Sequence, residues 1–230
     1  MDKLFKTILD LLYPPKCVGC GSFGHTLCNR CLGKIQPTKY HVCIVCQKPA
    51  IAGFTHMGCL SMHTPERLIV PFAYQNAVRK AILSGKFGMK SFYLFDYLVS
   101  FCLDYFSQTS VAFGEEAVVV PIPLHTKKQS KRGFNQSEVI ASALAKRLGL
   151  KLDRDTLVRV KHSSPQSTLG KSQRVQSVKD AFLCKDKSLA GKDIILVDDV
   201  CTTGSTLLSA SKALKQAGAR FVWCFALARA

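Results

Sequence analysis

Long apolar runs are missing from this sequence of 230 residues. No stretch approaches the roughly 18 apolar residues that a membrane-spanning helix requires, so we expect no transmembrane segment. The amino-terminal residues also lack the pattern of a secretory signal peptide. Asp2 and Asp10 interrupt their apolar residues, and no small-residue cleavage site follows. These absences predict a cytoplasmic protein.

Acidic side chains are scarce. The chain has 15 Asp and Glu against 32 Lys and Arg, which gives a net charge of +17 and a pI near 9.6. The imbalance is strongest in residues 126–180, with 13 basic and 4 acidic side chains. Such a charge favours polyanionic partners, namely nucleic acid, a membrane surface or phosphorylated substrates, although a plain soluble basic protein has the same composition.

Cysteine, by contrast, is abundant, with 11 residues. In a cytosolic chain, paired cysteines bind metal more often than they form disulfides. Each C-x-x-C turn directs two thiolates at one tetrahedral cation, so the three such turns of the first 60 residues predict structural zinc, in one or two sites. The cysteines of this segment are Cys17, Cys20, Cys28, Cys31, Cys43, Cys46 and Cys59.

The pairing of these cysteines is open from the sequence. The first four can close one site, which leaves three cysteines that need a fourth ligand for a second site. Met62 stands where a further C-x-x-C turn would place cysteine, so His63 is the nearest replacement and His56 the next. Interleaved pairs, or an empty and degenerate second site, are equally compatible with the spacing.

The pattern of apolar residues divides the chain into two parts. Residues 1–64 form the Cys-rich module, which opens with a short amphipathic helix, and residues 65–230 form an α/β domain. Continuous apolar runs between amphipathic segments predict a parallel sheet flanked by helices. The expected strands are 67–74, 117–120, 194–197 and 220–227, and the expected helices are 76–87, 91–106, 137–148 and one beginning near 207.

The most informative segment is residues 194–206. Two acids, Asp198 and Asp199, follow the apolar strand, and a turn rich in hydroxyl groups leads into a helix. The free N–H groups of a helix start and the hydroxyls of the turn form an anion cradle. Adjacent carboxylates suit a ligand with hydroxyls beside its phosphate, such as a sugar phosphate, or a metal held between them. The residues of the cradle are Thr202, Thr203, Gly204, Ser205 and Thr206.

A second strand, basic turn and helix unit precedes it, with the turn at residues 127–136. At the same edge of the sheet, Lys131 and Arg132 would neutralise a pyrophosphate, with Arg132 the better forked donor. A solvated basic loop is the alternative interpretation. Residues 161–178 show no apolar periodicity and predict a mobile loop.

Segment 194–206 resembles the 5-phosphoribosyl-1-pyrophosphate (PRPP) signature of type I phosphoribosyltransferases: an apolar strand, two acids and a Thr-Thr-Gly-x-Thr loop. The resemblance implies that Asp198 and Asp199 are the catalytic acids that bind the ribose hydroxyls, that the loop holds the 5-phosphate, and that Mg²⁺ accompanies PRPP. It also implies that the loop at 161–178 closes over the ligand. Cys201 departs mildly from the usual aliphatic residue.

The order of motifs resembles the ComF family more specifically. These are the C-x-x-C turns, Arg132-Gly-Phe-Asn-Gln-Ser137, Gln166 with Arg174 and Phe182, and the PRPP signature. The resemblance implies an amino-terminal zinc ribbon, a phosphoribosyltransferase-like domain, and a role in natural transformation with single-stranded DNA and the DNA-uptake or helicase machinery as partners. Met62 and Ser177 depart from the family pattern, in a zinc position and in the mobile loop.

Two classes of function therefore compete. In a DNA-binding protein, the basic stretch grips phosphates and aromatic rings stack on bases, with Lys127, Lys128, Phe134 and Arg174 as candidates. In the alternative, the chain is an active phosphoribosyltransferase of nucleotide salvage or metabolism with no DNA role. Against turnover, no segment for nucleobase specificity is visible, so the zinc module would have to cover the acceptor site.

Overall fold

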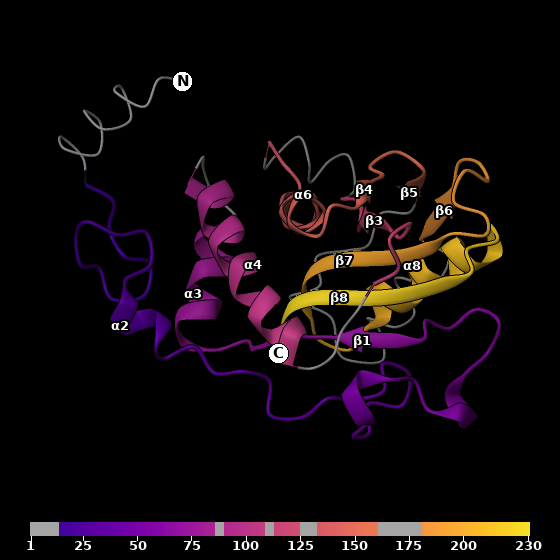
Figure 1. Ribbon diagram of the computed structural model, residues 1–230, viewed down its shortest axis with the longest axis horizontal. Coiled ribbons are helices and arrows are strands. Elements are labelled where there is room, and N and C mark those ends of the chain that lie inside the picture. Colours follow the sequence, from indigo (N-terminus) through magenta and orange to yellow (C-terminus); the bar gives the residue numbers. More distant parts are fainter. Residues whose placement is uncertain (1–13, 86–89, 109–112, 125–132, 161–180) are drawn as a thin grey trace.

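In a computed structural model of the chain, residues 14–85, 90–108, 113–124, 133–160 and 181–230 are described. Their main feature is a six-stranded sheet in the order β1-β8-β7-β3-β4, with β2 also paired to β8, and every pair is parallel (Figure 1). The strands are β1 Arg67–Ile69, β2 Phe72–Ala73, β3 Val118–Pro121, β4 Lys151–Leu152, β7 Asp193–Cys201 and β8 Phe221–Arg229. The predicted fold class, a parallel sheet flanked by helices, is confirmed.

Helices cover both faces of the sheet. The helices α3 (Asn76–Ser84), α4 (Lys90–Gln108) and α6 (Gln136–Leu148) pack on one face, in one core with alternate strand residues such as Ile195 and Val197. The other face is covered by α8 (Ser205–Gln216), in a second core with Ile194 and Leu196. A separate antiparallel pair, β5 (Leu157–Arg159) and β6 (Phe182–Cys184), lies on the α8 side.

Most predicted elements differ from the structure by one or two residues at their ends, and three differ by more. The strand expected at 67–74 is broken at Pro71, because proline has no N–H for the ladder. The helix expected to end at Gly88 ends earlier, at Ser84, with Gly85 as its cap. The strand expected at 194–197 continues to Cys201, because β8 pairs with it along this whole length. The two acids are thus part of the strand.

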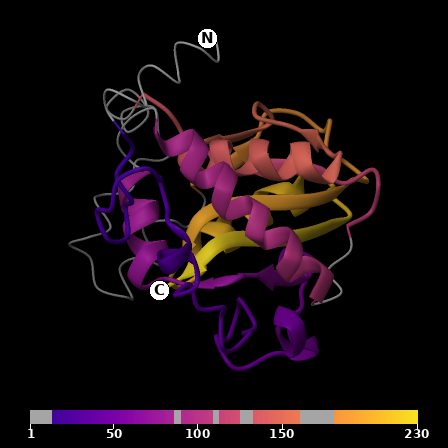
Figure 2. The ribbon, with the colours of Figure 1, turned by 60° about the vertical axis from the view of Figure 1, so that its left-hand side comes forward.

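The Cys-rich segment does not form one compact unit. It contains the short helices α2 (Asn29–Leu32), η1 (Ile51–Gly53) and η2 (Met57–Cys59). Cys17, Leu27 and Cys31 pack into the core on the α3 and α4 face, whereas Val42 and Ile44 belong to the core on the α8 face. Figure 2 shows the two parts apart, the first beside α3 and the second below the sheet.

In the described part of the chain, no helix is long and apolar enough to span a membrane. The opening helix predicted before residue 14 and the loop at 161–178 lie outside the described residues. Of the basic turn at 127–136, residues 127–132 also lie outside them.

Candidate functional site

The candidate site lies at the carboxyl edge of the sheet, where strands β3 and β7 end and helices α6 and α8 begin. A cavity of about 310 Å³ opens there, and polar side chains supply more of its lining than apolar ones. It is bounded by Ile122 after β3, by Gln136 and Ser137 of α6, and by the segment from Asp198 to Leu207. Ligands of open α/β sheets bind at this edge, as the sequence predicted.

Asp198, the first of the two acids, has hydrogen-bond donors from helix α6 and from its own strand. Ser137 donates its hydroxyl hydrogen bond to Asp198 Oδ1 at 2.9 Å, and the backbone N–H of Asp199 donates to the same oxygen at 2.9 Å. Burial and the neighbouring charge of Asp199 nevertheless raise the pKa of Asp198 to about 7, against the opposing effect of Ser137 and Arg159. The carboxyl group is therefore held close to its protonation midpoint at neutral pH.

The hydroxyl-rich turn has the geometry that the predicted anion cradle requires. Gly204 has a φ of 75°, in the left-handed region, and α8 begins at the next residue. The first N–H groups of a helix have no partner within it, so they can bind an anion at this end. In α8 the N–H of Ser205 donates to Thr203 Oγ1 at 3.4 Å. Thr203 Oγ1 donates to Ser205 Oγ at 3.1 Å, which orders the hydroxyls around the cradle.

The first two C-x-x-C turns meet in one cluster, made of Cys17, Cys20, Cys28 and Cys31, whose ligand atoms all lie within 4.8 Å of one another. The Cys20 and Cys28 sulfurs are 3.7 Å apart. Tetrahedral zinc with Zn–S bonds of about 2.3 Å requires sulfurs about 3.8 Å apart, so this donor set fits zinc. The first two C-x-x-C turns therefore share one cluster, and neither pairs with the third turn.

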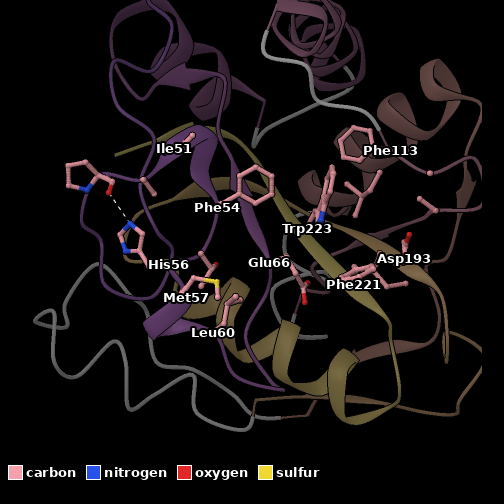
Figure 3. Close-up of a pocket in the computed structure, with 17 residues that line it drawn as sticks. Ile51, Phe54, His56, Met57, Leu60, Glu66, Phe113, Asp193, Phe221 and Trp223 are labelled. Atoms are coloured by element: carbon pink, nitrogen blue, oxygen red, sulfur yellow. Dashed lines mark hydrogen bonds between the residues drawn. The ribbon is translucent and has the colours of Figure 1, made fainter.

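The second cluster contains Cys43, Cys46, Cys59 and His56, and not His63. The preference for His63 was therefore wrong. His56 immediately precedes the 3₁₀ turn η2, and side chains three residues apart lie above one another in such a turn, so His56 meets Cys59. His56 Nε2 lies 3.0 Å from the Pro49 carbonyl oxygen (Figure 3). Its Nδ1 lies 3.3 Å from Cys46 Sγ.

This arrangement suits a zinc ligand, because histidine ligands usually donate their other ring N–H to a carbonyl or carboxylate. The sequence carries a signal that points to it, since His56-Met-Gly-Cys59 has the same two-residue spacing as the C-x-x-C turns. With two closed four-ligand sets, the clusters support structural zinc and offer no open position for catalysis.

Comparison with known proteins agrees with both halves of this geometry. The family model of the phosphoribosyl transferase domain matches residues 135–230, and that of the double zinc ribbon domain matches residues 8–61. Competence protein F of Haemophilus influenzae is 37% identical over 114 residues, 49% of this chain and 50% of that protein. DNA utilization protein YhgH of Salmonella typhi is 36% identical over 108 residues, 46% of this chain and 47% of that protein.

The chain thus spans about half the length of these two relatives. Competence protein ComFC of Bacillus subtilis is 28% identical over 203 residues, and this match extends over 84% of this chain and 79% of that protein. Together, the relatives and the two family models support the ComF family for this chain. The zinc ribbons and the phosphoribosyltransferase-like domain follow in the order predicted for ComF proteins.

Two residues of the candidate site have no role that the sequence predicts. Ser137, the last residue of the Arg132–Ser137 motif, donates a hydrogen bond to Asp198 directly. Arg159, at the end of β5, lines the cavity, and its guanidinium lies 5.2 Å from the centre of the Phe182 ring. Burial lowers the pKa of Arg159, and Asp198 opposes that shift. A lone arginine in a short strand carries no sequence signal that would have identified it.

The basic candidates are mostly outside the described residues. This applies to Lys127, Lys128, Lys131, Arg132 and Arg174. Phe134 is described, and it is partly buried against the core beside α4 and α6. Its role as a stacking partner for bases, like the roles of these cations, stays a prediction.

A larger cavity, of about 700 Å³, lies at the opposite end of the strands (Figure 3). Its walls are mainly apolar and include Phe54, Phe113, Phe221 and Trp223. The carboxylates that line it already have partners: Glu66 is paired with Lys215, and Asp193 with Arg220. The polar groups suited to a sugar phosphate are at the other cavity.

The assignment of His56 makes a direct prediction about metal content. His56→Ala is expected to reduce bound zinc from two equivalents to about one, because the second cluster loses a ligand. His63→Ala, the matched control, is expected to keep both. Zinc can be counted by elemental analysis of the purified variants. Loss of zinc from the His63 variant alone would contradict the assignment.

Proposed function

We propose that this ComF protein binds PRPP at the carboxyl edge of its sheet and acts in the cytoplasm on single-stranded DNA during natural transformation. The observation that carries the first part is one cavity of about 310 Å³ that joins an acidic strand end to a hydroxyl-rich helix start. A sugar phosphate has both complementary groups, hydroxyls for the acids and a phosphate for the cradle.

In this proposal, each part of the ligand has its own residues. Asp198 and Asp199 accept hydrogen bonds from the ribose hydroxyls, and the turn from Thr202 to Thr206 holds the 5-phosphate. Lys131 and Arg132, outside the described residues, meet the pyrophosphate. Mg²⁺ bound with PRPP would supply further positive charge for the pyrophosphate oxygens, which are ligands of the type that it prefers.

The DNA role is supported by charge and by relatives. The net charge of +17 favours a polyanion, and relatives bear the names competence protein and DNA utilization protein. Electrostatic grip on phosphates predicts that DNA affinity falls steeply as salt rises.

The test is a calorimetric titration of PRPP, with and without Mg²⁺, repeated with a single-stranded oligonucleotide already bound. We expect saturable PRPP binding that needs Mg²⁺, and oligonucleotide binding that weakens steeply between low and physiological salt. Absence of PRPP binding would refute the first part, and salt-independent or absent DNA binding the second. Pyrophosphate release that requires a nucleobase and occurs without any DNA binding would favour the salvage enzyme instead.

The pKa of Asp198 predicts a pH dependence for PRPP binding. The ionised carboxylate is the better acceptor for ribose hydroxyls, and its fraction rises through a pKa of about 7. PRPP affinity is therefore expected to rise about tenfold from pH 6 to pH 8. Ser137→Ala removes a hydrogen bond that lowers this pKa, so the midpoint is expected to move to higher pH.

The phosphate groups of PRPP titrate in the same way with the wild type and with Ser137→Ala. A difference between the midpoints of the two affinity profiles therefore comes from the protein. Protein stability should change in the opposite direction. Because the folded pKa of Asp198 is above its ordinary value of 3.8, the group favours folding at low pH, and this contribution is lost as pH rises through about 7. Identical affinity profiles for the two proteins would contradict the role given to Ser137.

A further inference from the structure

Two of the C-x-x-C turns fold alike, one in each metal cluster. In the first, the N–H of Gly21 donates to the Cys17 carbonyl at 2.7 Å, and in the second, the N–H of Gln47 donates to the Cys43 carbonyl at 2.9 Å. The residue that follows the second cysteine has a positive φ in both, 79° at Gly21 and 60° at Gln47. The two positions are structurally equivalent.

They are not chemically equivalent. Glycine adopts a positive φ without steric cost, whereas glutamine does so only with strain. A strained residue where glycine would fold more easily suggests that its side chain has a function. The first turn shows which residue the local geometry prefers, so the reason for Gln47 has to lie in what its side chain contacts.

The Gln47 carboxamide joins three segments of the chain. Nε2 donates to the carbonyl oxygen of Ile44 at 2.6 Å and to that of Thr203, in the phosphate cradle, at 3.3 Å. Oε1 accepts from Arg229 Nη2 at 3.0 Å, at the end of β8. Arg229 is paired in the sheet with Cys201, directly before the cradle. The cradle is thus held by the metal-binding turn from one side and by β8 from the other.

The backbone of the cradle also packs on this turn. Ile44, between the two cysteines, is fully buried. A Cβ atom on Gly204 would lie 2.8 Å from Ile44 Cγ1 and 3.5 Å from the Ile44 carbonyl oxygen, so the two backbones are in close contact. The position of the cradle therefore depends on the shape of the turn that Cys43 and Cys46 define.

We propose that Gln47 is a positioning residue that couples the second metal cluster to the phosphate cradle. As a result, the protein with metal in this cluster binds PRPP more tightly, and the protein with PRPP in the cradle binds the metal more tightly. This inference rests on the proposed function. Because coupling between two sites is reciprocal, PRPP strengthens metal binding by the same factor by which the metal strengthens PRPP binding.

The test uses the full chain loaded with zinc and compares Gln47→Gly and Gln47→Met with the wild type. Gln47→Gly restores the residue of the first turn, so it relieves backbone strain while it removes the side-chain contacts. The matched control is Gln36→Met, which replaces a glutamine of the Cys-rich segment that accepts from Gln75 at 2.7 Å and does not line the cavity of the cradle.

Two quantities are measured: the Kd of PRPP by calorimetry, and zinc affinity by competition with a chromogenic chelator, with and without PRPP. Of the three hydrogen bonds that the side chain makes, those with Thr203 and Arg229 hold the cradle, and their loss is expected to raise the Kd of PRPP about tenfold in both Gln47 variants. In the wild type, PRPP is expected to strengthen the binding of one of the two zinc equivalents. In the Gln47 variants, PRPP is expected to change the binding of neither equivalent. Gln47→Gly is expected to melt no lower than the wild type.

The outcomes separate this inference from the function on which it rests. If the wild type binds no PRPP, the proposed function fails. If the wild type binds PRPP but Gln47→Gly binds it equally well, and PRPP leaves both zinc equivalents unchanged, the coupling is refuted while the PRPP site stands. A merely structural glutamine would show that second pattern, because glycine relieves the only strain in question.

Discussion

Replacement of Asp198 and Asp199 together by asparagine is expected to weaken PRPP binding by at least about a hundredfold. Each carboxylate would lose a hydrogen bond to a ribose hydroxyl in which the acceptor is charged, a type worth about 1.5–3 kcal/mol. Asparagine has almost the same volume as aspartate, and it removes a negative charge whose burial is unfavourable at Asp198. The fold is therefore expected to survive, and the free energy of unfolding above pH 7 to rise.

The chain offers a matched control on the same strand. Asp193 begins β7 at the opposite edge of the sheet, where its two carboxylate oxygens accept from Arg220 at 2.7 and 2.8 Å. Asp193→Asn should leave the Kd of PRPP unchanged. Calorimetry on the two variants, with circular dichroism to check folding, decides the question. Tight PRPP binding by the folded double variant would remove the acids from the ligand site.

Gly204→Ala is expected to weaken PRPP binding about as much as the double replacement of Asp198 and Asp199, but for a different reason. At a φ of 75° an added methyl group is strained, and its Cβ would lie 2.8 Å from Ile44 Cγ1. The cradle must then move away from the metal-binding turn, so that its N–H groups no longer point at the phosphate. The strain alone lowers the free energy of unfolding by about 1–3 kcal/mol.

Gly191→Ala separates strain from displacement. Gly191 has a φ of 71°, and a Cβ atom placed on it meets nothing within 4 Å. This variant is expected to lose comparable stability in a denaturant titration yet to bind PRPP normally. If Gly204→Ala bound PRPP as tightly as Gly191→Ala did, the close contact between the cradle and Ile44 would have no functional meaning.

Local sequence patterns were sufficient to predict the main elements of this protein. A continuous apolar run is what a strand covered on both faces requires, so the sequence alone indicated a parallel sheet, with Asp198 and Asp199 at its edge. The hydroxyl-rich turn before α8 and the C-x-x-C turns are likewise local, since their function needs neighbouring residues at a fixed spacing. The bounds were less certain: β7 extends to Cys201 because of β8, a strand some twenty residues away in sequence.

What only the tertiary structure decided were the meetings between segments distant along the chain. Ser137 and Arg159 reach the acids from other elements, and Gln47 reaches Thr203 across 156 positions of sequence. His56, and not His63, joins the second cysteine cluster, because a 3₁₀ turn aligns it with Cys59. Spacing along the chain determines which side chains share a turn, whereas packing of the two cores determines which turns touch, and no local pattern encodes that choice.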